Sequence, residues 1–221
     1  MKSVPKQTFY NLSEEKRQRF LKTTLEEFAL YDYNSASLNR IVDVAGIAKG
    51  SIYQYFDNKK ELYQFLVETA VREKFTYIVY NLPDYPSDFY ELLNSLLLLN
   101  VKFDLKNPLK SKLLFNIFTE KNTDLLGSFP NSIAYLSDEF MTEFIKYAAA
   151  NDLLRSELDL EFTGFIINRF SQLIPDYIEK QHGSTYLEFI LDDSIPESCK
   201  LLEIQHIIAR FIDLFRLGLT Y

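Results

Sequence analysis

Apolar side chains recur every three or four residues along most of the chain, which is the period of an amphipathic α-helix. The first such stretch covers about residues 13–31, where Ser13 can cap the helix and acidic residues fill its first turn. A short second helix is expected to start after Ser37 and to end at Gly46. Six glycines and seven prolines fall singly between long stretches that lack both, which favours long helices over a hairpin-rich sheet protein.

The rest of the chain has the same helical period. Long helices are expected at about residues 60–81, 87–105, 108–122, 130–150, 157–182 and 198–219. A chain of 221 residues is long enough for one large domain or two small ones. We therefore predict an all-α fold in which residues 1–58 form a helix-turn-helix head and residues 59–221 form a larger helical domain.

The segment after Gly46 carries an unusual set of side chains. Ile52 and Phe56 lie four residues apart and face one side of a short helix. Its other faces carry hydroxyl and amide groups, from Ser51, Tyr53, Gln54 and Tyr55. The alternative for the two tyrosines is a core role, with one of them packed against the first helix. Two short helices joined by a tight turn containing glycine form a helix-turn-helix unit. Hydroxyl and amide groups suit phosphate oxygens and base edges in the major groove of DNA, with Gln54 able to pair with adenine.

Residues 37–62 resemble the TetR family of bacterial transcriptional regulators. The resemblance rests on four segments that occur in order at fixed spacing: Ala-Gly-Ile at 45–47, Lys-Gly at 49–50, Ile-Tyr-Gln-Tyr-Phe at 52–56 and Asn-Lys-Lys-Glu-Leu at 58–62. It extends back through the first helix and covers roughly the first 65 residues. Two positions depart from the family pattern. Asp32 stands where glycine is usual, and Ala48 replaces the serine or threonine that commonly caps the recognition helix.

The resemblance implies a homodimer whose paired recognition helices enter successive major grooves of a near-palindromic operator. The residues it places against DNA are Ser37, Arg40, Lys49, Gly50, Ser51, Tyr53, Gln54, Tyr55, Lys59 and Lys60. It further implies that the helical C-terminal domain dimerises and binds a small effector. We accordingly expect a repressor-type regulator that acts in the cytoplasm and is not an enzyme, with double-stranded DNA, a second copy and an effector as partners.

The charge distribution agrees with this division. Residues 1–60 carry a net charge of +3, whereas the whole chain carries −7, so residues 61–221 carry −10. A mildly basic head on an acidic body is typical of a small polyanion-binding module attached to a larger domain. The longest apolar run, residues 96–99, is far too short to span a membrane, and the N-terminus shows no signal peptide, so no membrane partner is expected.

The last two long helices carry apolar stripes too wide to be covered by packing on each other alone. We expect a four-helix dimer interface built from Phe162, Ile166, Phe170, Ile204, Ile208, Phe211 and Phe215. Coverage of these stripes by the preceding helices of the same chain is the alternative. A lipophilic or aromatic effector is expected to meet Leu96, Asn100, Phe103, Phe118, Phe140, Phe144, Asn168 and Arg169, although these residues could equally be core.

A second function class rests on the only two histidines. Both stand in a Glu-x-x-His motif, at residues 179–182 and 203–206, and ferritin-like metal-dependent oxidases use two such motifs with two further carboxylates. Two features argue against this alternative: His182 directly precedes Gly183, and the motifs lie on consecutive helices. We therefore predict no metal site, cofactor or catalytic residue. The single Cys199 excludes an internal disulfide and leaves a redox-sensing thiol as an open alternative.

Overall fold

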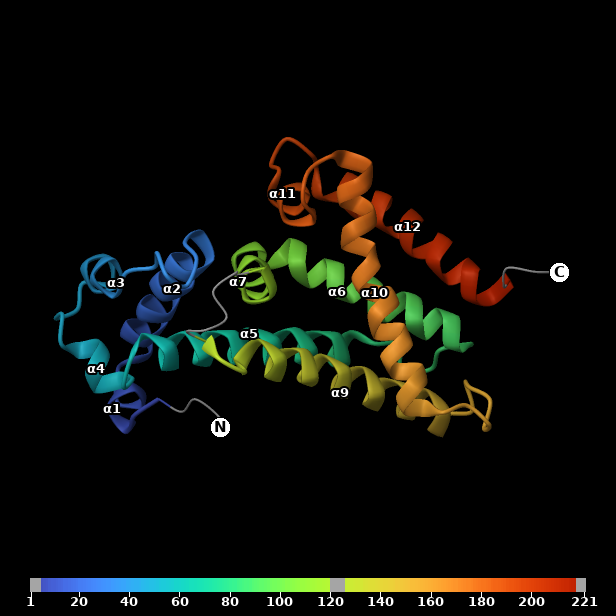
Figure 1. Cartoon of the computed structure of the whole chain (residues 1–221), viewed down its shortest axis with the longest axis horizontal. Helices are drawn as coiled ribbons and strands as arrows, with labels where there is room; N and C mark the ends of the chain where they lie inside the picture. Colours follow the sequence, from blue (N-terminus) through green and yellow to red (C-terminus); the bar gives the residue numbers. More distant parts are fainter. Residues whose placement is uncertain (1–4, 120–125, 218–221) are drawn as a thin grey trace. The chain divides into compact units, whose positions relative to one another are not determined.

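The computed structural model describes residues 5–119 and 126–217, and this part of the chain contains helices and no strand (Figure 1). The helices are α1 (Gln7–Tyr10), α2 (Glu14–Leu30), α3 (Leu38–Ala45), α4 (Ser51–Tyr55), α5 (Lys59–Asn81), α6 (Phe89–Lys106), α7 (Pro108–Thr119), α9 (Phe129–Ala150), α10 (Leu160–His182), α11 (Tyr186–Leu191) and α12 (Glu197–Leu217). The predicted all-α fold is confirmed. The sequence pattern missed two short helices, α1 and α11.

Local signals fix the helix ends in the first part of the chain. The Ser13 Oγ accepts a hydrogen bond from the backbone N–H of Lys16 at 3.5 Å and caps α2. Ser37 caps α3 in the same way, through a 3.4 Å hydrogen bond from the N–H of Arg40. Gly46 ends α3 with a left-handed backbone, at φ 67°, which explains why a glycine stands there.

The chain divides into two compact units. The N-terminal unit comprises Met1–Glu73 and Leu109–Asn131, and the C-terminal unit comprises Lys74–Pro108 and Ser132–Tyr221. The N-terminal unit is thus larger than the predicted domain of residues 1–58. The reason lies in packing: Tyr63 of α5 is fully buried against Phe28 of α2, with ring centroids 5.1 Å apart. The side chain of Asn116 in α7 also donates to the backbone carbonyl of Phe28 in α2, at 3.3 Å.

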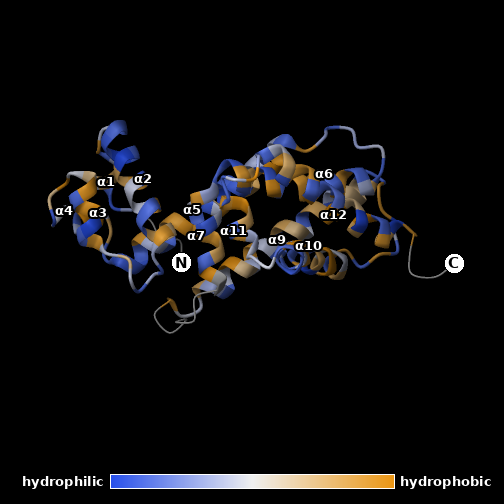
Figure 2. Cartoon of the chain, turned by 90° about the horizontal axis from the view of Figure 1, so that it is seen from above, coloured by the Kyte–Doolittle hydropathy of each residue, from blue (hydrophilic) through white to orange (hydrophobic). Residues whose placement is uncertain are grey.

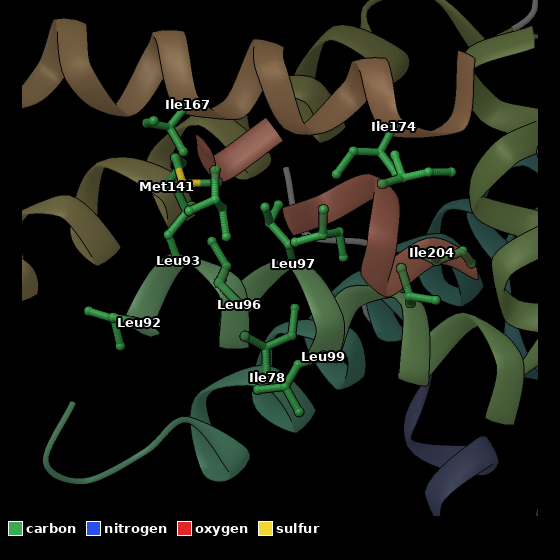
Figure 3. Close-up of a cluster of buried hydrophobic side chains, with 14 of the residues drawn as sticks. Ile78, Leu92, Leu93, Leu96, Leu97, Leu99, Met141, Ile167, Ile174 and Ile204 are labelled. Atoms are coloured by element: carbon green, nitrogen blue, oxygen red, sulfur yellow. The ribbon is translucent and has the colours of Figure 1, made fainter. Parts of the chain in front are cut away.

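The core of the C-terminal unit is built around α6. Figure 3 shows Leu93, Leu96 and Leu97 of α6 directed toward apolar side chains of neighbouring helices. The neighbours that close this cluster include Ile78 of α5, Met141 of α9, Ile167 and Ile174 of α10, and Ile204 of α12. Figure 2 shows hydrophobic and hydrophilic residues alternating around these helices, the pattern that burial of one face of each helix produces.

Helices α10 and α12 run antiparallel beside each other. Three contacts establish this: Phe170 lies edge-on to Phe215 with ring centroids 4.8 Å apart, the Tyr177 hydroxyl accepts from Arg210 at 3.1 Å, and His182 bonds Glu203 at 2.6 Å. As the α10 residue number rises, that of its α12 partner falls. The two helices therefore present a joint surface, which matters for assembly.

A buried ionic network ties α5, α6 and α11 together. The Lys74 ammonium of α5 donates to Oδ1 of Asp104 in α6 at 2.8 Å, and the Tyr186 hydroxyl of α11 donates to Oδ2 at 3.1 Å. Burial, reinforced by the Asp104 charge, raises the pKa of the Tyr186 phenol well above its ordinary value of 10.0. The phenol therefore stays protonated and donates to Asp104 at neutral pH.

Within the described ranges, none of the helices combines the length and the apolar character that crossing a lipid bilayer requires.

Candidate nucleic-acid interface

A helix-turn-helix occupies residues 38–55 of the N-terminal unit, with α3 and α4 joined by the turn after Gly46. The turn is held at the end of α3, where the Ile47 N–H donates to the Val42 carbonyl at 3.1 Å. Arg19 of α2 also donates to the Val44 carbonyl at 3.2 Å and so caps α3 with a positive charge. The C-terminal end of α3, from which the turn leads into α4, is therefore capped by both a backbone and a side-chain donor.

Helix α4 divides into a buried and an exposed side. Ile52 and Phe56 are completely buried, as the four-residue spacing predicts. The exposed side and the preceding turn carry Lys49, Ser51, Tyr53 and Gln54, of which Tyr53 is 55% exposed. The side chains of these four residues make no hydrogen bond or ion pair with any residue that the structure describes. We call them the α4 outer face, and its donors and acceptors are available to an external partner.

Tyr55 does not belong to this outer face, contrary to the expectation that it contacts DNA. Only 7% of the residue is exposed, and its ring packs edge-on against Phe9 and Phe20, with centroids 6.1 and 5.6 Å away. Tyr55 follows Ile52 by three residues, so the two side chains lie on the same side of α4. Its role is to fasten α4 to the aromatic core of the head.

Arg40, another residue expected to contact phosphate, is fastened to the head by hydrogen bonds, although 46% of its side chain is exposed. Its guanidinium bonds both carboxylate oxygens of Glu27, with Nη2 to Oε1 at 2.6 Å, and also the Ser35 carbonyl at 2.8 Å. Glu27 is itself buried and accepts the Ser37 backbone N–H at 2.5 Å. Ser37 thus keeps the capping role expected of it, while Arg40 ties α3 to α2.

Lys59 and Lys60 also have neighbours within the N-terminal unit. The Lys59 ammonium donates to the Ala36 and Asn34 carbonyls at 2.6 and 3.2 Å and lies 4.8 Å from the Tyr33 ring centroid. The Lys60 ammonium lies beside Gly127, 3.9 Å from where a Cβ of that residue would stand. Lys59 therefore has a structural role, to which a phosphate contact would be an addition. Lys49, on the α4 outer face, is the better candidate for a phosphate contact.

Gly50 precedes α4 in an ordinary conformation, with φ −79° and ψ −10°. A Cβ at this position would meet no atom within 4 Å, so the protein itself does not require a glycine here. This absence of internal constraint fits the expectation that the backbone at Gly50 approaches an external phosphate.

The Gly50→Ala variant tests this expectation. Thermal stability is expected to change by less than about 1 kcal/mol, since the methyl group enters open space. Operator affinity is expected to fall about tenfold, because the methyl group pushes the backbone away from the phosphate. Melting temperature and fluorescence-anisotropy titration with operator DNA measure the two effects. Unchanged operator affinity would contradict a close backbone approach at Gly50.

The described residues expected to line an effector pocket have partners within the C-terminal unit. Leu96, Phe103 and Phe144 are buried in the C-terminal unit, and the Phe140 ring stacks on Phe75 with centroids 4.2 Å apart. The polar members bond within the chain, Asn100 to the Leu96 carbonyl, and Asn168 and Arg169 to Asp138. The Phe118 side chain lies outside the described residues. An apolar pocket exists elsewhere in this unit, between α6, α10 and α12, lined in part by Leu97, Phe170, Ser171, Phe211 and Phe215.

The expected dimer-interface residues also separate into two groups. Ile204 and Ile208 are fully buried in the core of the single chain, so they are closed to a partner. Phe162 is 61% exposed, while Ile166, Phe170, Phe211 and Phe215 are half-buried. Helix α12 turns its isoleucines toward α6 because that helix supplies an apolar partner within the chain.

The two Glu-x-x-His motifs meet, but in a different way from a di-metal site. His182 of the first motif bonds Glu203 of the second at 2.6 Å, and His206 is exposed. Throughout residues 5–119 and 126–217, no three His, Cys, Asp or Glu side chains are grouped closely enough to hold a metal ion. The motif pair therefore forms a bond between α10 and α12 in this structure. Cys199 is exposed, near the start of α12.

The residues that hold the head together carry weak signals in the sequence. Glu27 had the appearance of an ordinary surface acid on a helix, and its burial depends on Arg40, thirteen residues away. Lys6 and Thr8 precede the first predicted helix, yet both contact α4. The sequence signal for this segment is the aromatic pair Phe9 and Tyr10, ahead of the first predicted helix.

Comparison with known proteins agrees with this geometry. The model of the family described as "Bacterial regulatory proteins, tetR family" matches residues 20–65, from α2 into α5. The Escherichia coli (strain K12) protein named "Probable acrEF/envCD operon repressor" is 23% identical over 175 residues, which cover 76% of this chain and 78% of that protein.

Solved structures extend the similarity to the whole chain. A TetR family transcriptional regulator from Chloroflexus aurantiacus J-10-FL is 28% identical, with 97% of this chain and 98% of that chain covered and a TM-score of 0.70. The fatty acid degradation regulator FadR from Bacillus halodurans shares the fold at 16% identity, with 95% and 99% covered and a TM-score of 0.64. A helix-turn-helix whose outer polar side chains have no partner among the described residues, a family match over residues 20–65 and a fold shared over 97% of the chain lead to one assignment: the head is that of a TetR family regulator, and the chain as a whole resembles bacterial transcriptional regulators of that family.

Proposed function

We propose that this protein is a homodimeric repressor that binds a near-palindromic operator in the cytoplasm and releases it in response to a small effector. The observation that carries the DNA-binding part is the α4 outer face, whose polar side chains have no partner among the described residues. The name of the Escherichia coli relative, an operon repressor, supports repression as the direction of control. We assign no catalytic role to the chain.

The α4 outer face offers two kinds of contact. Lys49, Gly50 and Ser51 surround the start of α4, where backbone N–H groups and a positive charge suit phosphate oxygens. Tyr53 and Gln54 lie further along the helix and suit base edges in the major groove. A glutamine amide pairs in a bidentate manner with adenine, so Gln54 is the residue that we assign to sequence readout.

Dimerisation rests on the surface that α10 and α12 share. Five large apolar side chains of these two helices are between 44% and 61% exposed: Phe162, Phe165 and Leu173 of α10, and Leu202 and Leu214 of α12. A second copy, related by a two-fold axis, would bury them in a four-helix interface. A dimer also provides the two recognition helices that a near-palindromic operator needs.

The effector is proposed to act by changing the spacing of the two heads. Recognition helices must sit about 34–36 Å apart to reach successive major grooves. An effector that prefers a different spacing would lower operator affinity by the ratio of its affinities for the two states. The interior of the C-terminal unit is apolar, so an effector that binds there would be a lipophilic or aromatic molecule.

Selection from a random DNA duplex library at two salt concentrations tests the DNA-binding proposal. An enriched near-palindrome is expected, with half-sites about one helical turn apart and affinity that falls as salt rises. A matched pair of variants makes the test more specific. Lys49→Ala is expected to weaken binding to all duplexes, whereas Gln54→Ala is expected to change the preferred base. Binding that is wholly salt-driven, with no enriched sequence, would contradict the proposal.

A further inference from the structure

The C-terminal end of α4 is capped by a segment near the N-terminus, more than 40 residues earlier in the sequence. The last three carbonyls of α4 belong to Tyr53, Gln54 and Tyr55, and a five-residue helix leaves them without helical N–H donors. All three accept hydrogen bonds from residues 6–8. The Lys6 ammonium donates to the Tyr53 carbonyl at 2.9 Å, the Lys6 backbone N–H donates to that of Tyr55 at 2.8 Å, and the Thr8 hydroxyl donates to that of Gln54.

This segment, Lys6–Phe9, which we call the N-terminal clasp, is itself anchored in the head. Phe9 is 2% exposed, and its ring lies 6.2 Å from that of Phe20 and 5.5 Å from that of Phe56, between centroids. The Lys6 ammonium pairs at 2.6 Å with the carboxylate of Asp57, two residues beyond the end of α4. The clasp therefore connects the recognition helix to α2 and to the loop that follows α4.

Helix α4 needs such support from outside. A helix of five residues is far below the length at which an isolated helix is stable in water, so its order depends on tertiary contacts. At its start the N-cap is Gly50, which provides no side-chain hydrogen bond. The positive charge of Lys6 also stands at the negative end of the helix dipole. The clasp thus stabilises the end of α4 that carries Tyr53 and Gln54.

We propose that the N-terminal clasp is a positioning element that sets the orientation of the recognition helix, and that Lys6 and Thr8 determine operator specificity without touching DNA. The inference rests on the proposed function in one respect, namely that α4 reads the operator. The charge of Lys6 is compensated by Asp57, which distinguishes it from a free phosphate-binding lysine. Thr8 acts through its hydroxyl alone.

The test compares Thr8→Val and Lys6→Met with the wild-type chain. Each variant is expected to lower affinity for the selected operator about tenfold and affinity for a random duplex less than about twofold, because base readout needs an oriented helix and phosphate attraction does not. The salt dependence of Thr8→Val is expected to match the wild type. Thr8→Ser, which keeps the hydroxyl, is expected to restore operator affinity. Lys16→Met, at another exposed lysine of the head, is the matched control.

Amide hydrogen exchange in the DNA-free protein gives a readout that is independent of the operator. The N–H groups of α4 are expected to exchange at least about tenfold faster in both variants, while those of α2 and α3 keep the wild-type rates. Unchanged exchange in α4 would overturn the clasp even if no operator is found. Equal losses of affinity for operator and random DNA, with a smaller salt dependence for Lys6→Met, would also overturn the clasp, because they would show that Lys6 contacts phosphate. A wild-type chain that selects no sequence would contradict the proposed function alone.

Discussion

Lys74→Met is expected to lower the free energy of unfolding of the protein by about 3 kcal/mol, because it removes the ion-pair partner of a buried carboxylate. The Asp104 side chain is 10% exposed and that of Lys74 18%, with 2.8 Å between Nζ and Oδ1. Methionine fills a similar volume to the lysine stem, so the loss reports on the charge more than on packing. Urea unfolding followed by circular dichroism, at fixed protein concentration, measures the change.

Two further variants show whether the charge pair is responsible. Lys74→Met/Asp104→Leu removes both charges and is expected to recover most of the stability, since a well-packed apolar pair often equals a buried ion pair. Tyr186→Phe keeps both charges and removes one neutral donor, so its expected loss is about 1 kcal/mol. If the double variant is no more stable than Lys74→Met, the network does not hold the unit together through its charges.

The head could be predicted because its signals are local. Ser13, Ser37 and Gly46 each determine a helix end through their own side chain or backbone, and the structure places α2 and α3 between them. The four-residue spacing of Ile52 and Phe56 correctly identified the buried side of α4. Short-range rules suffice where a residue acts on its immediate neighbours.

Local signals do not reveal a partner that lies far along the chain. Tyr55 and Arg40 have the residue types and positions of DNA contacts, and the structure also gives them partners within the head, Phe9 and Glu27. A single sequence does not show that a tyrosine near the end of a short helix meets a phenylalanine 46 residues earlier. The N-terminal clasp was missed for the same reason, since Lys6 and Thr8 gain their role only from the fold.

The C-terminal unit shows a different limit. A wide apolar stripe on α12 predicts burial but does not state which neighbour provides it. Ile204 and Ile208 are buried by the chain itself, whereas Leu202 and Leu214 of the same helix remain 54% and 49% exposed. The exposed members define the surface left for a partner.

The Phe162→Glu/Leu173→Glu variant is expected to be monomeric, because both residues lie on one exposed stripe of α10, eleven residues or about three turns apart. Phe162 is 61% exposed and Leu173 45% in the single chain, so glutamates there cost the isolated fold little. In the proposed dimer they would place four carboxylates in an apolar contact. The dimer association constant is expected to fall more than about 100-fold, since each buried large side chain contributes about 1.5–3 kcal/mol.

Sedimentation velocity over a range of micromolar concentrations, together with operator titration, measures this loss. Operator affinity is expected to fall with dimerisation, since a single head reaches only one half-site. The matched control is Tyr80→Glu/Tyr85→Glu, which places the same charges on residues that are 84% and 95% exposed outside α10 and α12. Equal effects of the two double variants would point to added charge as the cause. A dimer that survives Phe162→Glu/Leu173→Glu at full affinity would place the interface on another face of the C-terminal unit.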